Sequence, residues 1–363
     1  GLGMKFGILF TSHPDIEKEP YPHRDVHARV TRQIVEADRL GYDTAWIAEH
    51  HFSNTYGILP DPFVYAAYLA DKTERIKIGT GVMTLPLYDP MRVVENAAFV
   101  DVLTNGRFIL GLGSGYRPYE FEGFGVPFDE RRDIQEEAVD LILESFHTGR
   151  ATHAGKYFDN TISGDYEIFP RSIQQPHPPL YMAAGSERSI GYGAEKGMGL
   201  MLSTLTRSQD LATQISHYRS RMATAPDQLA ANPAFGHVDV ARWVYVADTD
   251  AKAKEESEAG IVKHISAFMG KNTAGYLGAI QKADVDTVRY DELAETTLLH
   301  GSPDTVIAKL KALQKETGMT SVVIHYPPYY GHEKTVAMLK LFAETVLPEL
   351  QKDEAPLTAL AAE

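Results

Sequence analysis

Short apolar runs alternate with helical patterns along the chain. The first run, MKFGILF at residues 4–10, precedes a polar stretch in which three prolines between residues 14 and 22 predict a long loop rather than a helix. Apolar or small residues then recur at helical spacing over residues 25–40, and Gly41 ends the pattern as a helix C-terminal glycine would. The start of the chain therefore predicts a strand, a loop and a helix.

The same alternation of strand and helix patterns continues to the end of the chain. Further strands are predicted at residues 42–50, 75–83, 107–113, 179–184, 199–203, 240–247 and 321–326, and helical patterns at 62–73 and 90–103 separate the early ones. Eight strands, each followed by a helical segment, favour a closed (β/α)8 TIM barrel over an open doubly wound sheet, which usually has about five or six strands. The predicted fold class is α/β.

Two stretches of the chain are additional to the strand and helix units of a minimal barrel. Residues 151–178 are rich in Gly, Asp and Pro and predict an irregular or hairpin insertion, whereas residues 250–300 are helical in character. The second insertion is interpreted either as a lid over the barrel mouth or as structural padding. We expect one barrel domain at residues 4–350, with residues 1–3 as a cloning scar and 351–363 as a C-terminal tail.

Composition narrows the possible functions. The chain has 363 residues, no cysteine and a formal net charge of −14, which disfavours nonspecific binding to nucleic acid or anionic membranes. The absence of cysteine excludes disulfides, thiolate metal sites and cysteine nucleophiles. The sequence has no apolar run of about 18 residues and no secretory leader pattern, so the expected location is cytoplasmic.

The second predicted strand ends in ionisable residues, in the stretch AWIAEHHF. The C-terminal ends of barrel strands form the active site, so Glu49, His50 and His51 are candidates for proton transfer. If strand alternation continues, Glu49 and His51 face one side and His50 the other. A hydrogen-bonded structural role stays open for each imidazole. Because adjacent strand histidines diverge and no HExxH pattern occurs, we expect no metal site.

GLGSGY follows the fourth predicted strand. It matches two glycines of the dinucleotide fingerprint, but Tyr116 occupies the position of the third, and no helix pattern begins there. We interpret Gly113 and Ser114 as part of a flexible loop whose backbone N–H groups could approach a ligand. The aromatic stretch that follows either lines the mouth or packs as an ordinary loop.

AAGSERS follows the fifth predicted strand. Ser186 is a candidate helix N-cap, and together with Ala184, Gly185 and Ser189 it forms a turn that could bind phosphate at a helix N-terminus. A capped helix without a ligand is the alternative. Glu187 would repel a phosphate unless its carboxylate points to solvent.

Two further strand ends add to the predicted mouth. Thr80, Gly81 and Val82 lie at the end of the third predicted strand, where small residues either leave room for a flat ring or fill a close-packed barrel layer. His325 ends the eighth strand before YPPYY and contributes an ionisable and aromatic wall. Together with Phe52 and Tyr116, His325 is a predicted substrate-pocket residue.

Over nearly its whole length the sequence resembles the bacterial luciferase-like family of flavin-dependent monooxygenases. The resemblance rests on GYDTAWIAEHHF, RIKIGTGVMTLPLYDPMRVVENAAFVDVLTNGRFILGLGSGY, EFEGFGVPFDER, PLYMAAGSERSI and GSPDTVIAKLKAL. It implies a (β/α)8 barrel that binds reduced FMN (FMNH2) from a separate flavin reductase and reacts it with O2. The implied flavin C4a-hydroperoxide then oxygenates a small organic substrate.

The resemblance also implies roles for single residues. His50 corresponds to the active-site histidine of the family and Glu49 to a neighbouring buried acid. Gly81 and Val82 match a position where relatives often have a non-prolyl cis peptide bond beside the flavin ring. The phosphate-binding turn corresponds to AAGSERS.

Two departures from luciferase change the expected reaction. The luciferase catalytic subunit has a cysteine and an arginine where this chain has Gly113 and Ser114, although Arg117 or Arg188 could supply the missing charge. Gly185 stands where luciferase has an acidic residue. We therefore expect a non-luminescent monooxygenase.

Substrate and assembly stay open. An aldehyde, a ketone, a terpenoid or an aromatic compound would fit, and the resemblance implies a homodimer paired through helices near the second and third strands. The alternatives are a deazaflavin-dependent hydride-transfer enzyme, a flavin-binding protein without turnover, and a metal-dependent barrel hydrolase or aldolase.

Overall fold

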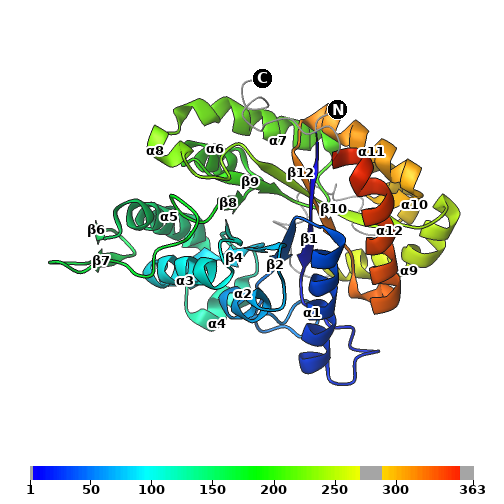
Figure 1. Ribbon diagram of the computed structural model, residues 1–363, viewed down its shortest axis with the longest axis horizontal. Coiled ribbons are helices and arrows are strands. Elements are labelled where there is room, and N and C mark those ends of the chain that lie inside the picture. The colour runs from blue at the N-terminus through cyan, green and yellow to red at the C-terminus, as the bar shows by residue number, and fades with distance from the viewer. Residues whose placement is uncertain (1–2, 270–287, 352–363) are drawn as a thin grey trace.

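Parallel strands close into a barrel in the computed structural model of the chain, which describes residues 3–269 and 288–351 (Figure 1). The barrel strands in order are β1 (Lys5–Phe10), β2 (Thr44–Ile47), β3 (Lys77–Thr80), β5 (Phe108–Gly113), β8 (Leu180–Ala183), β9 (Gly199–Leu202), β10 (Val238–Val246) and β12 (Ser321–His325). Each strand pairs in parallel with the next, and β12 pairs back to β1 with Gly7 opposite Val323. The predicted (β/α)8 barrel is confirmed, and all eight of these strands fall where the sequence predicted them.

Helices surround the strands. They are α1 (Pro22–Leu40), α2 (Pro62–Ala70), α3 (Pro90–Leu103), α5 (Arg131–Thr148), α6 (Glu187–Glu195), α7 (Ser208–Arg221), α11 (Pro303–Thr317) and α12 (His332–Gln351). Figure 1 shows α1 and α12 side by side next to β1, and these two helices are in contact. The ring is continued by α11, which packs between α7 and α12.

The first helix begins earlier than predicted. Pro22, one of the prolines assigned to the loop, is the first residue of α1, where its missing N–H costs no hydrogen bond and its fixed φ suits a helix. The other end is as predicted, because Gly41 adopts a left-handed φ of 91° and its N–H donates to the last carbonyls of the helix.

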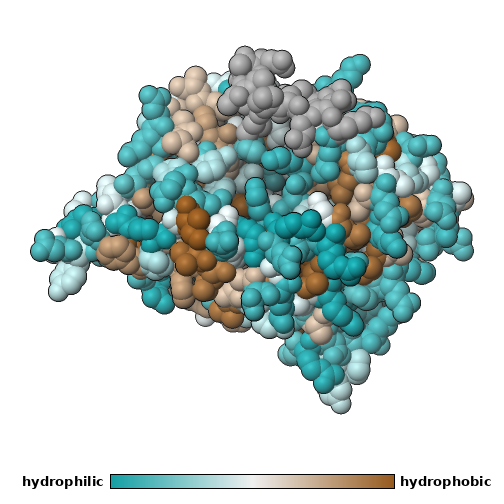
Figure 2. Space-filling model, in the orientation of Figure 1, coloured by the Kyte–Doolittle hydropathy of each residue, from teal (hydrophilic) through white to brown (hydrophobic). Residues whose placement is uncertain are grey.

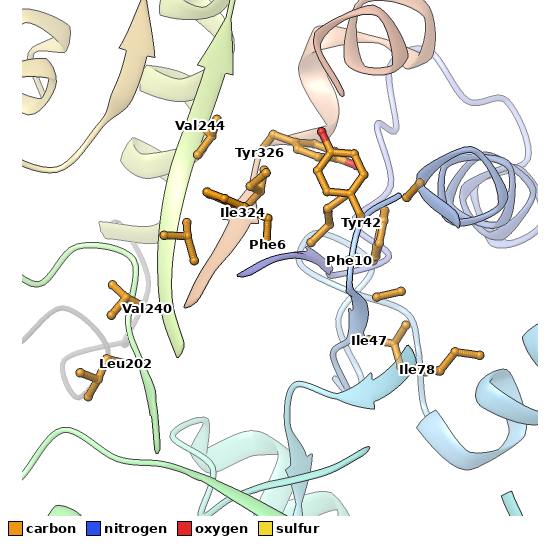
Figure 3. Packing of buried hydrophobic residues seen from close by; sticks show 14 of the residues in the cluster. Phe6, Phe10, Tyr42, Ile47, Ile78, Leu202, Val240, Val244, Ile324 and Tyr326 are labelled. Atoms are coloured by element: carbon orange, nitrogen blue, oxygen red, sulfur yellow. The ribbon is translucent and has the colours of Figure 1, made fainter. Parts of the chain in front are cut away.

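Each barrel strand has one face buried against the surrounding helices and one face in the barrel interior. Outward side chains pack against the helices, and Figure 3 shows Phe6, Phe10, Ile324 and Tyr326 packed together where β1 and β12 adjoin. A smaller interior cluster comprises Trp46, Ile109, Tyr181, Ala234 and Val323, and Leu9, Met201 and Ala241 pack against it while keeping part of their surface accessible. Because Leu9, Met201 and Ala241 stay partly accessible, we infer a hollow beside them in the barrel interior.

Trp46 lies across the barrel interior because its neighbours have no side chain. A Cβ atom on Gly7 would lie 2.9 Å from the indole Nε1, and one on Gly79 would lie 2.6 Å from Cε3. The ring of Tyr181 meets Trp46 edge-on at 5.3 Å between centroids. The two rings form a floor beneath the mouth.

Further elements connect the barrel units. The first insertion contains an antiparallel hairpin of β6 (Thr152–Ala154) and β7 (Asp159–Thr161). The second contains α9 (Asp250–Met269), α10 (Tyr290–Thr296) and β11 (Leu299–Gly301). Short elements at the rim and between helices are β4 (Met83–Thr84), α4 (Pro118–Phe124), α8 (Asp227–Ala230) and the 3-10 helices η1 (Leu85–Leu87), η2 (Phe128–Glu130), η3 (Met222–Thr224) and η6 (Pro328–Tyr330). The middle of the predicted lid, the C-terminal tail after Gln351 and the first two residues lie outside the described residues.

The surface in Figure 2 is largely hydrophilic, with an apolar patch on the half of the molecule that carries α3 and α5. Five apolar or aromatic side chains on α2 and α3 are exposed: Val64, Tyr68, Phe99, Val102 and Leu103. Within residues 3–269 and 288–351, none of the helices combines the length and the apolar character needed to cross a membrane.

Candidate active site

Glu49 and His51 form a buried pair just beyond β2. The strand ends at Ile47, earlier than predicted, yet the two side chains still fall on one side, and Nε2 of His51 lies 2.6 Å from Oε2 of Glu49. The other carboxylate oxygen accepts hydrogen bonds from the hydroxyl of Tyr88 at 2.8 Å and the N–H of Thr84 at 3.3 Å. Burial raises the pKa of Glu49, and the bonds from His51 and Tyr88 oppose part of that shift.

His50 points to the other side, towards a different carboxylate. Its Nδ1 lies 3.6 Å from Oε2 of Glu120, which is longer than a hydrogen bond, while that oxygen accepts the backbone N–H of His51 at 2.7 Å. The side chain keeps 11% of its surface accessible. Burial lowers the pKa of His50, and Glu120 opposes part of the shift, so the imidazole is neutral at pH 7. It can accept a proton or donate its ring N–H.

Aromatic rings hold His50 in place. Tyr56 meets its ring edge-on at 4.4 Å between centroids, and the hydroxyls of Tyr56 and Tyr116 lie 2.8 Å apart. The guanidinium of Arg117 lies 3.5 Å from the centroid of Tyr56 on one face of the ring. Burial raises the pKa of Tyr116, so its hydroxyl stays protonated at neutral pH. The predicted pocket residue Tyr116 thus belongs to the surroundings of His50.

Phe52 lies elsewhere. Its side chain is 63% exposed, and its ring packs against Phe124 of α4 at 5.1 Å between centroids. The short helix α4 itself was not predicted, because its pattern begins at Pro118, two residues beyond the glycine-rich stretch. The structure therefore does not bring Phe52 to His50.

The segment after β3 approaches the glycines of β5 closely. The Gly81–Val82 peptide bond is cis, as the resemblance implied. The hydroxyl of Thr80 donates to the carbonyl of Gly111 at 2.8 Å and accepts its N–H at 2.8 Å, so that this side chain joins two strands. A Cβ on Gly113 would lie 2.5 Å from Cγ2 of Val82. The glycines of β5 therefore make room for the neighbouring segment after β3. The sequence interpretation had instead explained them by a close approach of the backbone to a ligand. Ser114, the next residue, is half-buried.

The turn after β8 caps α6 as predicted. The Ser186 hydroxyl accepts the N–H of Ser189 at 3.2 Å and donates to the Ser189 hydroxyl at 3.0 Å. Gly185 is exposed, and a Cβ there would meet nothing within 4 Å, while Ala184 is half-buried. The first turn of α6 thus presents backbone N–H groups beside an open approach.

The two candidate replacement arginines lie apart. Arg188 extends from α6 to the carboxylates of Asp133 and Glu136 on α5, at 3.2 and 2.9 Å. The guanidinium of Arg188 is therefore occupied by ion pairs on the surface, whereas Arg117 lies beside His50.

His325 ends β12 on the barrel interior. It is 4% exposed and stacks on Trp243 of β10, with ring centroids 4.1 Å apart and an interplanar angle of 19°. Burial lowers the pKa of His325 to about 3, so this imidazole is also neutral at pH 7. The predicted wall therefore consists of a stacked pair of rings.

Sequence reasoning missed several contributors to the site. Tyr56 and Tyr88 come from segments between strands and helices, where periodicity does not show which way a side chain faces, and Glu120 comes from the short helix α4, which was not predicted. Trp243 could have been found, since it lies in the middle of a predicted strand and faces inward by alternation with Ala241. Among the described residues, no group of three or more His, Asp or Glu side chains has an arrangement suited to a metal ion.

Comparison with known proteins finds related sequences over most of the chain. The model of the luciferase-like monooxygenase family matches residues 4–321. An uncharacterized protein, y4vJ, from Sinorhizobium fredii is 34% identical over 220 residues, and that match covers 61% of each chain. The alkanal monooxygenase alpha chain of the Kryptophanaron alfredi symbiont is 24% identical over 96% of this chain and 99% of its own.

Solved structures share the fold over nearly the full length. The monooxygenase RslO1 from Streptomyces bottropensis superposes with a TM-score of 0.79 at 24% identity, covering 95% of this chain and 99% of its own. The oxygenating constituent of 3,6-diketocamphane monooxygenase from Pseudomonas putida, solved with FMN, gives a TM-score of 0.77 at 21% identity and covers 96% and 99%. An F420-dependent secondary alcohol dehydrogenase gives 0.71 at 14% identity and covers 97% and 100%. At these identities the likeness concerns the fold alone.

Proposed function

Because the chain belongs to the luciferase-like monooxygenase family, we propose that it uses reduced FMN and O2 to oxygenate a small organic substrate. The observation that carries the proposal is His50, a neutral imidazole packed against Tyr56 and 3.6 Å from Glu120 at the mouth of the barrel. Such a group can hold or transfer one proton near neutral pH, as an oxygenation requires. A separate flavin reductase would supply the FMNH2.

The residues of the mouth fit FMN. The hydroxyls of Ser186 and Ser189 and the first N–H groups of α6 would hold the phosphate, and the open space at Gly185 admits it. The backbone at Gly81 and Val82 would lie against the flavin ring. The hydroxyl of Thr80 is already engaged between β3 and β5, so this residue would act through its main chain.

The protein's own groups would control water and protons. When bound, reduced FMN supplies the electrons that activate O2. Leu9, Met201 and Ala241 line the hollow with apolar surface and limit the access of water. Glu49 stays fixed by Tyr88 and Thr84, so the His50 side of the segment keeps its position.

The first experiment measures cofactor choice. The purified protein is titrated with FMN, reduced FMN and the deazaflavin F420, and the reduced complex is then mixed with O2. We expect reduced FMN to bind and to reoxidise on the protein at a rate that differs from that of the free cofactor. Tight binding of F420 without binding of FMN would favour the hydride-transfer alternative.

The second experiment tests His50. In a His50→Ala variant we expect the rate of H2O2 release from the reduced FMN complex to change by roughly 10²-fold or more, because a positioned acid or base contributes at least that much. His23→Ala, which alters an exposed imidazole on α1, is the control. Unchanged H2O2 release in His50→Ala would refute the role of His50. FMN binding with no effect of the protein on reoxidation would favour a flavin-binding protein without turnover.

A further inference from the structure

Trp243 and His325 occupy paired positions on neighbouring barrel strands. The register of β10 and β12 places Trp243 opposite His325 and Ala241 opposite Val323. Val323 belongs to the interior cluster and Ala241 packs against it, so alternation directs Trp243 and His325 to the same interior, one layer nearer the mouth. That interior is the hollow beneath which Trp46 forms the floor.

The polar atoms of this pair have no partner in the described part of the chain. Nε1 of Trp243 and both ring nitrogens of His325 are buried, and none makes a hydrogen bond within residues 3–269 and 288–351. Leaving a buried donor or acceptor without a partner costs about 1–3 kcal/mol each, and buried polar groups in folded proteins are nearly always satisfied. Three such atoms on two stacked rings indicate that a bound molecule completes their bonding.

Aromatic rings connect this pair to His50. His264 of α9 lies 5.1 Å from Trp243 and 5.1 Å from His13, measured between ring centroids. His13 lies 6.0 Å from Tyr56, which contacts His50 at 4.4 Å. A molecule bound at Trp243 and His325 therefore has a continuous wall of rings that ends at the proposed proton-transfer group.

The charge state of the wall limits its ligand. Burial lowers the pKa of His325 to about 3 and the pKa of His264 well below its usual value, so both imidazoles are neutral at pH 7. Neutral N–H groups bind neutral oxygen acceptors without having to compensate a buried ionic charge, whereas a buried carboxylate would need a cation. The rings themselves favour a flat ligand.

We propose that Trp243 and His325 form a substrate subsite for the oxygen of an uncharged, flat molecule, such as an aromatic or conjugated ketone or a phenol. The indole N–H and one imidazole nitrogen bind that oxygen, and the rings leading to His50 bind the hydrocarbon. The inference rests on the proposed function, since it assigns this molecule the place of the substrate. It favours flat aromatic compounds over long-chain aldehydes.

The test compares three probes of similar size. Dissociation constants of 1-indanone, indane and indane-1-carboxylate are measured by equilibrium dialysis with wild type, His325→Phe and Trp243→Phe. We expect wild type to bind the ketone at least tenfold more tightly than the hydrocarbon and to exclude the carboxylate. Both variants keep an aromatic ring, and each should lose most of the ketone preference while indane binding changes little.

A matched control separates this effect from burial alone. His237→Phe alters a half-buried imidazole that meets Tyr181 edge-on at the entry of β10, and it should retain the ketone preference. Thermal melting and FMN titration of all variants check folding and the cofactor site.

Equal affinity of wild type for 1-indanone and indane would overturn the proposal, as would a ketone preference that survives in both His325→Phe and Trp243→Phe. The cofactor measurements distinguish this failure from a failure of the proposed function. Absence of a ketone preference in wild type with normal FMN chemistry refutes the subsite alone, and a wild-type ketone preference without FMN binding refutes the monooxygenase proposal alone.

Discussion

Adjacent histidines at the exit of β2 meet different carboxylates. His51 is bound to Glu49 at 2.6 Å, whereas His50 lies 3.6 Å from Glu120, beyond hydrogen-bond distance. The loose contact leaves burial as the dominant influence on His50, so its pKa falls although an acid is close by. The neutral form of His50 is therefore the form present at pH 7.

This charge balance predicts the pH dependence of FMN reoxidation. Because burial lowers the pKa of His50, the acid limb of the rate profile should have its midpoint below about 6.5, the usual value for histidine. Glu120 raises the pKa of His50, so Glu120→Gln should move that midpoint to still lower pH. Stopped-flow rates between pH 4.5 and 8 measure the midpoint. A midpoint that moves upward in Glu120→Gln would contradict this electrostatic assignment.

Strand alternation predicted which of these residues share a side, and it did so even though β2 ends before them. It could not identify Tyr56, which lies in a loop, or Glu120, which lies in the short helix α4, because neither has a fixed period that relates it to a strand end. Their approach to His50 depends on how two separate connections fold over the mouth. The partners of a catalytic candidate are therefore less predictable than the candidate itself.

Two helices of the barrel begin with the same serine cap, and only one of them has a proposed ligand. Ser186 accepts the N–H of Ser189 at 3.2 Å at α6, and Ser302 accepts the N–H of Thr305 at 3.2 Å at α11. This likeness separates the capping role of a serine from a role in binding phosphate.

Ser186→Ala and Ser302→Ala should each lower the free energy of unfolding by about 1 kcal/mol, the usual effect of losing an N-cap. Ser186→Ala should also weaken FMN binding by roughly tenfold, because hydrogen bonds to charged groups contribute about 1.5–3 kcal/mol. Denaturant unfolding and FMN titration provide the two measurements. Equal FMN affinity in the two variants would show that the Ser186 turn does not bind the phosphate of FMN.

At the scale of elements, the eight barrel strands were predictable because each is a local apolar run bounded by turn residues. The role of α9 was not, since periodicity cannot say which helix after β10 joins the outer ring. In the structure α11 takes that place, packed between α7 and α12. Only tertiary contacts distinguish a barrel helix from an inserted one.

Buried neutral imidazoles link the stability of the whole molecule to pH. Four imidazoles have folded-state pKa values of about 3 to 4: His177, His300 and His325, which are buried, and His237, which is half-buried. In the unfolded chain each binds a proton below about pH 6.5, so their contribution is complete above that pH and is lost as the pH falls. Asp239, whose pKa burial raises to about 7, acts in the opposite direction.

The free energy of unfolding should therefore decrease between pH 6.5 and 4.5, with each buried imidazole contributing about 1.4 kcal/mol per pH unit. His177→Phe should make the decrease shallower, and Asp239→Asn should make it steeper because the opposing carboxyl is gone. Denaturant unfolding across this range measures the slope, with His23→Gln as an exposed control. A slope that is identical in all variants would refute the linkage.

Assembly is proposed from the exposed apolar side chains of α2 and α3. Tyr68 is 54% exposed and Phe99 49% exposed, and burial of such residues against a second copy would favour a homodimer. Light scattering should give twice the mass of one chain for wild type and a lower mass for Phe99→Glu. Tyr166→Glu, at an 80% exposed position in the insertion, should leave the mass unchanged. A wild-type monomer would contradict the proposal.

The floor of the barrel also limits the length of a ligand. Trp46 spans the interior, and its neighbours Gly7 and Gly79 have no side chains that could replace it. A smaller residue at position 46 would therefore deepen the cavity, because no neighbouring side chain would fill the space that the indole leaves. The side chain at position 46 thus sets how deep a molecule can enter the barrel, and a single substitution there would change the size of molecule that the barrel admits.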